Sequence, residues 1–186
     1  MNKYWQNSIT FDAYIKETER RIAVQNPEDD HNEYYELGLQ RMNRTLKTFK
    51  IDEEQLNVLK SKNFNGKILI ISEPWCGDAS ATVPAVTQFF EAADIEVKIF
   101  LKDSDTSLIE QFLTNGTQSI PKILILNEDF SVKNVWGPRP NFGNELLKKF
   151  KENPETYPRE EFYNDLQVYY AKNRGKDAIT ELLELL

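Results

Sequence analysis

The only cysteine of this 186-residue chain, Cys76, lies where an apolar segment meets a helical one. The run Ile68–Ile71 is continuously apolar, which is typical of a buried strand, and residues 79–93 follow with a helical pattern. A strand that leads directly into a helix favours an α/β fold. At the start of a helix, the helix dipole stabilises negative charge on sulfur. Because the thiolate is the reactive form of cysteine, this junction suits a nucleophile.

The segments around this junction complete the pattern of an open sheet. The sequence predicts strands at residues 67–72, 95–101, 123–126 and 131–136, with helices at 79–93, 103–113 and 141–150. We therefore expect an α/β fold, with a mixed central sheet of about four strands flanked by helices. Helical patterns on both sides predict three parts. These are an N-terminal helical extension packed on the core (1–60), the α/β core (61–150) and a C-terminal helical extension (151–186).

Charge and composition narrow the classes of function. A net charge of −7 argues against a nucleic-acid surface, which needs a basic face. The longest apolar runs are far shorter than the roughly 20 residues of a membrane span, so no membrane partner is expected. The segment Met1–Asn7 lacks the apolar stretch of a secretion signal, and a single cysteine fits a reducing compartment, so we expect a cytoplasmic protein. With one cysteine and one histidine, no metal site and no cofactor are expected.

The residues around Cys76 resemble those of the thioredoxin family. In that family a strand is followed by Trp-Cys-Gly-Pro-Cys at the start of a helix, with a proline eight residues after the first cysteine. Here Trp75, Cys76 and Gly77 match the first three positions, and Pro84 has the expected spacing. The sequence Trp-Cys-Gly-Asp-Ala between helical extensions is similar to a bacterial branch of thioredoxin-like proteins.

Two later elements match the same family in order and spacing. The family has a cis-proline, preceded by Ile or Thr, that faces the cysteine from the start of a later strand. Ile120 and Pro121 stand at that point, and Gly137 matches a family glycine after the fourth strand. The resemblance implies a thioredoxin-like fold over about residues 61–150.

Three departures from the family pattern concern the redox machinery. Ala79 replaces the second cysteine, Asp78 replaces the proline between the cysteines, and Ile70 replaces a buried aspartate held to accept a proton from the second thiol. Without a second cysteine the chain cannot close an internal disulfide. A mixed disulfide on Cys76 is therefore released only by a thiol from outside the protein.

Cys76 and Asp78 are the expected catalytic residues, and each has a simpler interpretation. A free cysteine is often a small buried hydrophobe, but the start of a helix leads us to expect an accessible, reactive thiol. Asp78 either stabilises the helix start through the dipole or takes part in catalysis. In both cases its charge raises the pKa of the neighbouring thiol.

The expected substrate-binding residues surround this thiol. X-Pro bonds are cis in only about 5–6% of cases, but the resemblance implies a cis bond before Pro121, which leaves Ile120 free to pair with an extended peptide. Trp75 is either a groove wall or a core residue, and we expect it to be partly exposed. The substrate-binding set is Trp75, Gly77, Ile120, Pro121 and Gly137.

Two other polar residues receive no role. Arg139, in Gly-Pro-Arg-Pro, is the one nearby cation that a carboxylate ligand could contact, but a solvated loop arginine is the simpler interpretation. His31 lies among acidic residues in a loop that we expect to be far from the motif.

These residues predict a monothiol redox protein. Cys76 attacks disulfides or small-thiol adducts on proteins, and an external thiol regenerates it, so the expected partners are protein or low-molecular-weight thiols. The alternative is a non-catalytic module that holds a partner peptide in the groove beside Pro121. A one-cysteine peroxidase conflicts with Glu73, where peroxiredoxins have threonine, and shared metal binding lacks the glycine-rich contacts of monothiol glutaredoxins. The sequence does not reveal the oligomeric state.

Overall fold

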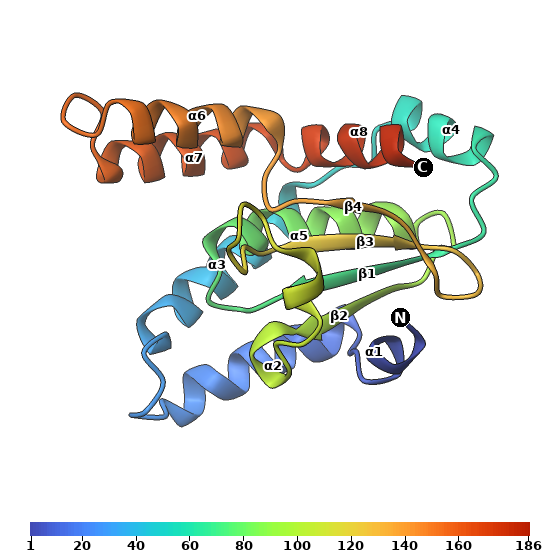
Figure 1. Ribbon diagram of the computed structural model, residues 1–186, viewed down its shortest axis with the longest axis horizontal. Helices are drawn as coiled ribbons and strands as arrows, with labels where there is room; N and C mark the ends of the chain where they lie inside the picture. The colour runs from blue at the N-terminus through green and yellow to red at the C-terminus, as the bar shows by residue number, and fades with distance from the viewer.

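The computed structural model describes all 186 residues and has a four-stranded sheet between layers of helices (Figure 1). The strand order is β2-β1-β3-β4. The strands are β1 (Lys67–Ser72), β2 (Val97–Leu101), β3 (Lys122–Leu126) and β4 (Val132–Trp136). Strand β1 pairs parallel to β2 and antiparallel to β3, and β3 pairs antiparallel to β4. The sheet is therefore mixed, as the sequence predicts.

Eight α-helices surround this sheet. They are α1 (Asn2–Gln6), α2 (Phe11–Val24), α3 (Asn32–Thr48), α4 (Glu53–Ser61), α5 (Gly77–Glu91), α6 (Asn141–Glu152), α7 (Arg159–Asn173) and α8 (Lys176–Leu185). Helix α5 contacts β1, β2, α3 and α8, whereas α1 and α2 contact β2. Helices α6 and α7 lie side by side as a hairpin that projects at the upper left of Figure 1.

The apolar character of the central strands places the main core at the sheet. Every residue of β3 is buried, as are all residues of β1 after the first. A second cluster joins α7 to the start of α5: its buried members are Ala81, Tyr157, Phe162, Leu166 and Tyr170. This second cluster holds α7 of the C-terminal region beside the residues that follow Cys76.

A glycine lets α3 lie against the segment before Cys76. A Cβ atom on Gly38 would come within 2.6 Å of the carbonyl oxygen of Pro74. No side chain fits in that space, so glycine permits the close approach of the two backbones. Helix α3 thereby faces the start of α5.

One predicted helix, at residues 103–113, is wrong. The segment forms two short 3₁₀ turns, Lys102–Ser104 and Ile109–Phe112. Asp105 between them is extended, and its side chain accepts a hydrogen bond from the backbone N–H of Ser107 at 2.9 Å. An aspartate that bonds the backbone two residues ahead favours a turn over a helix. No helix of the chain combines the length and the apolar character that crossing a bilayer requires.

Candidate functional site

Cys76 is the residue immediately before α5, and it lies against the start of β3. Its thiol donates a hydrogen bond to the carbonyl oxygen of Ile120, with 3.3 Å between Sγ and the oxygen. The Ile120–Pro121 peptide bond is cis. The fold thus brings together two elements that the sequence separates by 44 residues.

The thiol is buried, with 8% of the residue exposed. Burial, and after it the charge of Asp78, raise the pKa of Cys76 from an ordinary value of 9 to about 12. Backbone N–H groups at the start of α5 and the Arg139 guanidinium act in the opposite direction. The expectation of an accessible thiol is therefore wrong for this state, because desolvation outweighs the start of the helix.

The Asp78 carboxylate is held by two side chains, the partly exposed Arg139 and the buried Tyr170. Its Oδ2 lies 2.7 Å from Arg139 Nη2, and its Oδ1 accepts a hydrogen bond from the Tyr170 hydroxyl at 2.9 Å. Burial raises the pKa of Asp78, and Arg139 is the strongest influence that lowers it. The carboxylate is thus stabilised by side chains from the loop after β4 and from α7.

The interpretation of Arg139 as a solvated loop residue is wrong. Only 18% of its side chain is exposed, and Gly143 of α6 allows it to pack closely, since a Cβ there would lie 3.3 Å from Arg139 Cβ. The flanking residues Pro138 and Pro140 are buried as well. The loop therefore folds back over the start of α5, which nothing in its composition indicates.

A second buried ion pair lies on the other side of the motif. The Glu73 carboxylate is fully buried, with Arg21 Nη1 of α2 2.9 Å from its Oε2. Its Oε1 accepts a hydrogen bond from the backbone N–H of Asp103 at 2.7 Å. Burial raises the pKa of Glu73, and these two contacts oppose that shift. Sequence reasoning missed this pair, although an acidic residue directly after a buried strand was a usable signal.

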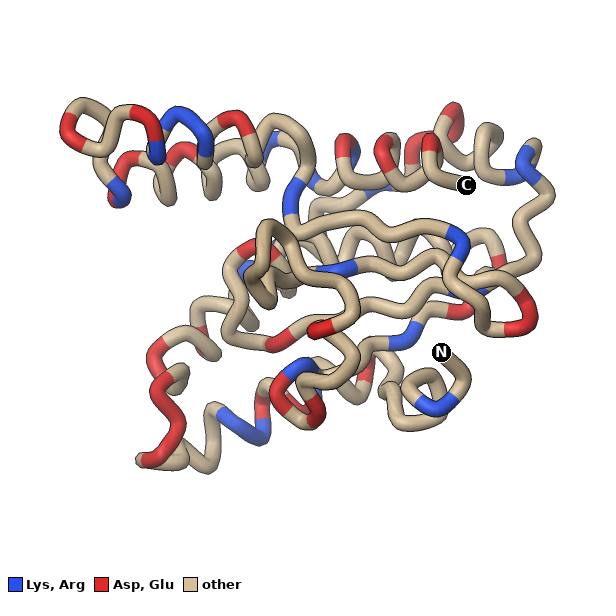
Figure 2. The backbone as a smooth tube through the Cα atoms, in the orientation of Figure 1, with Lys and Arg blue, Asp and Glu red and all other residues tan.

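Trp75 is partly exposed, as expected, and other side chains contact both the edge and the face of its indole ring. Its indole Nε1 donates to Asp103 Oδ2 at 2.9 Å. The His31 ring stacks on it, with 4.4 Å between ring centroids and 14° between planes. The expectation that His31 lies far from the motif is therefore wrong, because the turn before α3 returns to Trp75. Acidic residues gather along that turn, at the lower left of Figure 2.

Gly137 contacts the proline segment through its backbone. Its φ is +114°, and a Cβ on it would lie only 2.3 Å from the carbonyl oxygen of Pro121. Both constraints require glycine. Of the expected substrate-binding residues, Gly137 thus packs on Pro121, and Ile120 contacts Cys76; Ile120 and Pro121 are buried rather than open to a groove.

Two further polar side chains approach Gly77 from opposite helices. A Cβ at Gly77 would lie 3.4 Å from Arg41 Nη1, on α3, and 3.7 Å from Gln167 Nε2, on α7. Neither residue belongs to the motif, and their positions depend entirely on how the outer helices pack. Gly77 itself is partly exposed, as is Trp75 on the other side of the buried Cys76.

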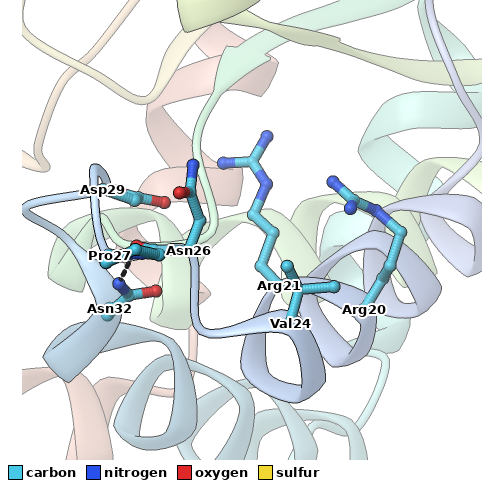
Figure 3. Close-up of a pocket in the computed structure, with 7 residues that line it drawn as sticks. All are labelled: Arg20, Arg21, Val24, Asn26, Pro27, Asp29 and Asn32. Carbon is cyan, nitrogen blue, oxygen red and sulfur yellow. Dashed lines mark hydrogen bonds between the residues drawn. The ribbon is translucent and has the colours of Figure 1, made fainter.

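A cavity of about 360 Å³ lies at the end of α2, apart from the cysteine (Figure 3). It is lined by Arg20, Arg21, Val24, Asn26, Pro27, Asp29 and Asn32. Both arginines are already paired with Glu17. No group of three or more His, Cys, Asp or Glu side chains is placed to hold a metal ion. The one thiol of the chain, Cys76, does not line this cavity.

Comparisons with known proteins agree with this arrangement. The family model described as thioredoxin matches residues 25–151. No curated protein matches the chain. A solved structure of a protein of unknown function from Pseudomonas aeruginosa is similar over 96% of this chain and 91% of its own, with 17% identity and a TM-score of 0.58. An HIV epitope scaffold is similar over 99% and 95%, with 16% identity and a TM-score of 0.60. At these identities the two structures show the fold alone.

Proposed function

Because the chain belongs to the thioredoxin family, we propose that it is a monothiol redox protein that exchanges Cys76 with disulfides or with small-thiol adducts on proteins. The observation that carries this proposal is the 3.3 Å contact between Cys76 Sγ and the Ile120 carbonyl oxygen. It sets the thiol beside backbone that an extended substrate can pair with by strand addition. Substrates are thus proteins or low-molecular-weight thiols in a reducing bacterial cytoplasm, rather than nucleic acid or membrane.

The proposed reaction is an exchange in two steps. The Cys76 thiolate attacks one sulfur of a disulfide R–S–S–R′, a new bond forms between Cys76 and R–S, and R′–S⁻ leaves and takes up a proton. An external thiolate R″–S⁻ then attacks the R sulfur, which forms R–S–S–R″ and returns Cys76 as a thiolate. The net change is the replacement of R′ by R″. The electrons that reduce R′–S come from the external thiol.

The proposed catalytic role of Asp78 is to receive the proton that Cys76 loses. Burial raises the pKa of this carboxylate, which makes it a better proton acceptor than an exposed aspartate. The substrate approaches from the partly exposed residues Trp75 and Gly77. In the proposed three-part division, both extensions contribute side chains to the site: Arg41 from residues 1–60 and Tyr170 from residues 151–186.

The test uses a model protein that carries a 2-mercaptoethanol mixed disulfide, with cysteamine as the external thiol. We expect the purified chain to accelerate release of mercaptoethanol above the rate with cysteamine alone. Cys76→Ser, checked for an unchanged circular dichroism spectrum, should show only the uncatalysed rate. Equal acceleration by both proteins would overturn the proposal.

The second candidate function is a non-catalytic module that binds a partner peptide beside Pro121. The observation in its favour is the burial of Cys76, which raises the pKa of the thiol to about 12. A thiol that stays protonated at neutral pH is a poor nucleophile. Alkylation of Cys76, measured across pH with and without a bound disulfide peptide, distinguishes the two candidate functions. Alkylation at neutral pH that occurs only when the peptide is bound favours redox exchange.

A further inference from the structure

An arginine without a partner lies next to Gly77, the residue after the cysteine. The side chain of Arg41 is half-buried between α3 and the start of α5, and it forms no hydrogen bond or ion pair within the chain. Burial lowers the pKa of this guanidinium, and the charge of the neighbouring Arg44 lowers it further. Holding such a cation partly out of water costs free energy that no contact in the free protein offsets.

The only carboxylate that influences Arg41 is already occupied. Asp78 attracts Arg41 electrostatically, but its two oxygens are bonded to Arg139 and Tyr170. Two guanidinium groups therefore share one carboxylate at this point. Arg139 also has a buried Nε with no acceptor. Although the chain as a whole carries a net charge of −7, the start of α5 has two guanidinium groups, Arg139 and Arg41, around the one carboxylate of Asp78.

Gly77 has no side chain between its backbone and Arg41. A Cβ atom on this residue would fall 3.4 Å from Arg41 Nη1 and 3.7 Å from Gln167 Nε2, so two nitrogen donors from different helices converge on one point. The Gln167 side chain has no hydrogen-bond partner of its own, since its buried Oε1 is also unbonded. A planar group with two acceptor oxygens can take one hydrogen bond from each nitrogen.

We propose that Arg41 and Gln167 anchor a carboxylate of the substrate one residue away from Cys76, so that the preferred substrates are adducts of thiols that carry an acidic group. This inference rests on the proposed function for its reaction, but the anchor itself is a binding site that can be measured separately. An arginine paired with a carboxylate forms hydrogen bonds about twice as strong as neutral ones, which is enough to select among small thiols.

The binding arm uses probes that cannot react. We expect 3-(methylthio)propanoate to shift the amide NMR signals of Gly77 and Asp78 saturably, and 3-(methylthio)propan-1-ol, which lacks the carboxylate, to leave them unchanged. Arg41→Gln should abolish the shift, and Gly77→Ala should weaken it by filling the space. Arg44→Gln, an exposed arginine on the same helix, should retain it. Equal shifts with both probes, no saturable shift, or binding that survives Arg41→Gln would overturn the anchor.

The reaction arm compares two adducts on one model protein, 3-mercaptopropanoate and 3-mercaptopropanol. The Cys76-dependent release of the acidic adduct should be about tenfold faster, a ratio typical of one charge-assisted contact, and Arg41→Gln should bring the two rates together. If neither adduct is released by Cys76 while the carboxylate probe still binds, the redox proposal fails and the anchor stands. If release occurs without any carboxylate preference, the anchor fails and the redox proposal stands.

Discussion

The hydroxyl of Tyr170 donates a hydrogen bond to the carboxylate of Asp78, 2.9 Å away and 92 residues earlier in the chain. Helix α7, in the C-terminal region, therefore helps to hold the charge beside Cys76. Because that charge raises the pKa of the thiol, packing of the outer helices influences the chemistry of the motif. Four variants test how these contacts determine the pKa of the thiol and the stability of the fold.

Asp78→Asn should lower the pKa of Cys76. The substitution removes the charge that, after burial, raises this pKa most, and it leaves the Arg139 guanidinium to favour the thiolate. A neighbouring charge commonly shifts a pKa by about one unit or more, so alkylation by iodoacetamide at pH 8 should be about tenfold faster. Asp94→Asn, at an exposed position in the turn after α5, serves as the control. Alkylation reports the thiolate fraction alone, so identical rates for the two variants would contradict the electrostatic effect of Asp78 on the thiol and not its proposed part in proton transfer during exchange.

The raised pKa of Cys76 predicts a loss of stability in alkaline solution. Below pH 9 the thiol is protonated in both folded and unfolded chains, whereas between pH 9 and about 12 only the unfolded chain loses the proton. Stability therefore falls as the pH rises through this window, by up to about 1.4 kcal/mol per pH unit.

Cys76→Ser removes this titration and leaves the tyrosines in place. Between pH 8 and 10 the unfolding free energy of the wild type, measured with urea, should fall by about 1.4 kcal/mol more than that of Cys76→Ser. Parallel curves over this range would show that the thiol is not buried in solution.

Arg21→Met should destabilise the fold through Glu73. The variant keeps the aliphatic length of the side chain but leaves a fully buried carboxylate without its cation, which costs about 3 kcal/mol or more. Burial already raises the pKa of Glu73, so the loss should shrink as the pH falls and the carboxyl becomes protonated. Arg20→Met, an exposed neighbour bonded to the same Glu17, should cost less than about 1 kcal/mol. Equal losses in urea unfolding would argue against the buried pair.

Gly137→Ala should be far more damaging than Gly116→Ala. Both residues have positive φ values, +114° and +77°. Only at Gly137 does a Cβ collide with backbone, 2.3 Å from the Pro121 carbonyl oxygen, whereas nothing lies within 4 Å of a Cβ on Gly116. We expect losses of about 3 kcal/mol or more and about 1 kcal/mol respectively, measured from urea midpoints. Similar losses at the two positions would mean that the contact with Pro121 does not constrain the fold.

The elements with a strong local pattern could be predicted from the sequence. Strand β1 has the predicted bounds, 67–72, because a buried strand with continuous apolar character has no competing periodicity. The resemblance to thioredoxin, carried by the order and spacing of Trp75–Gly77, Pro84 and Ile120–Pro121, implied that the proline segment faces Cys76, and the contact between Cys76 and Ile120 agrees with it. The prediction of a helix at residues 103–113 was wrong because the turn at Asp105 competes with an otherwise acceptable helical pattern.

The surroundings of the thiol could not be predicted in the same way. Arg139 and Tyr170 reach Asp78 from segments 61 and 92 residues further along the chain, and His31 reaches Trp75 from 44 residues before it. Each of these contacts depends on how a loop or an outer helix packs, which no local pattern encodes. Burial of Cys76 follows from the same packing, so a lone cysteine at the start of a helix did not reveal the direction of its pKa shift.

The most direct test of the proposed exchange is a single-turnover mass measurement. The chain is mixed, without any other thiol, with a model protein that carries a 3-mercaptopropanoate adduct, and its intact mass is followed with time. The account predicts that the wild type gains the mass of the adduct at Cys76, and that Cys76→Ser gains none. A wild-type chain that keeps its original mass while the adduct stays on the model protein would contradict the account.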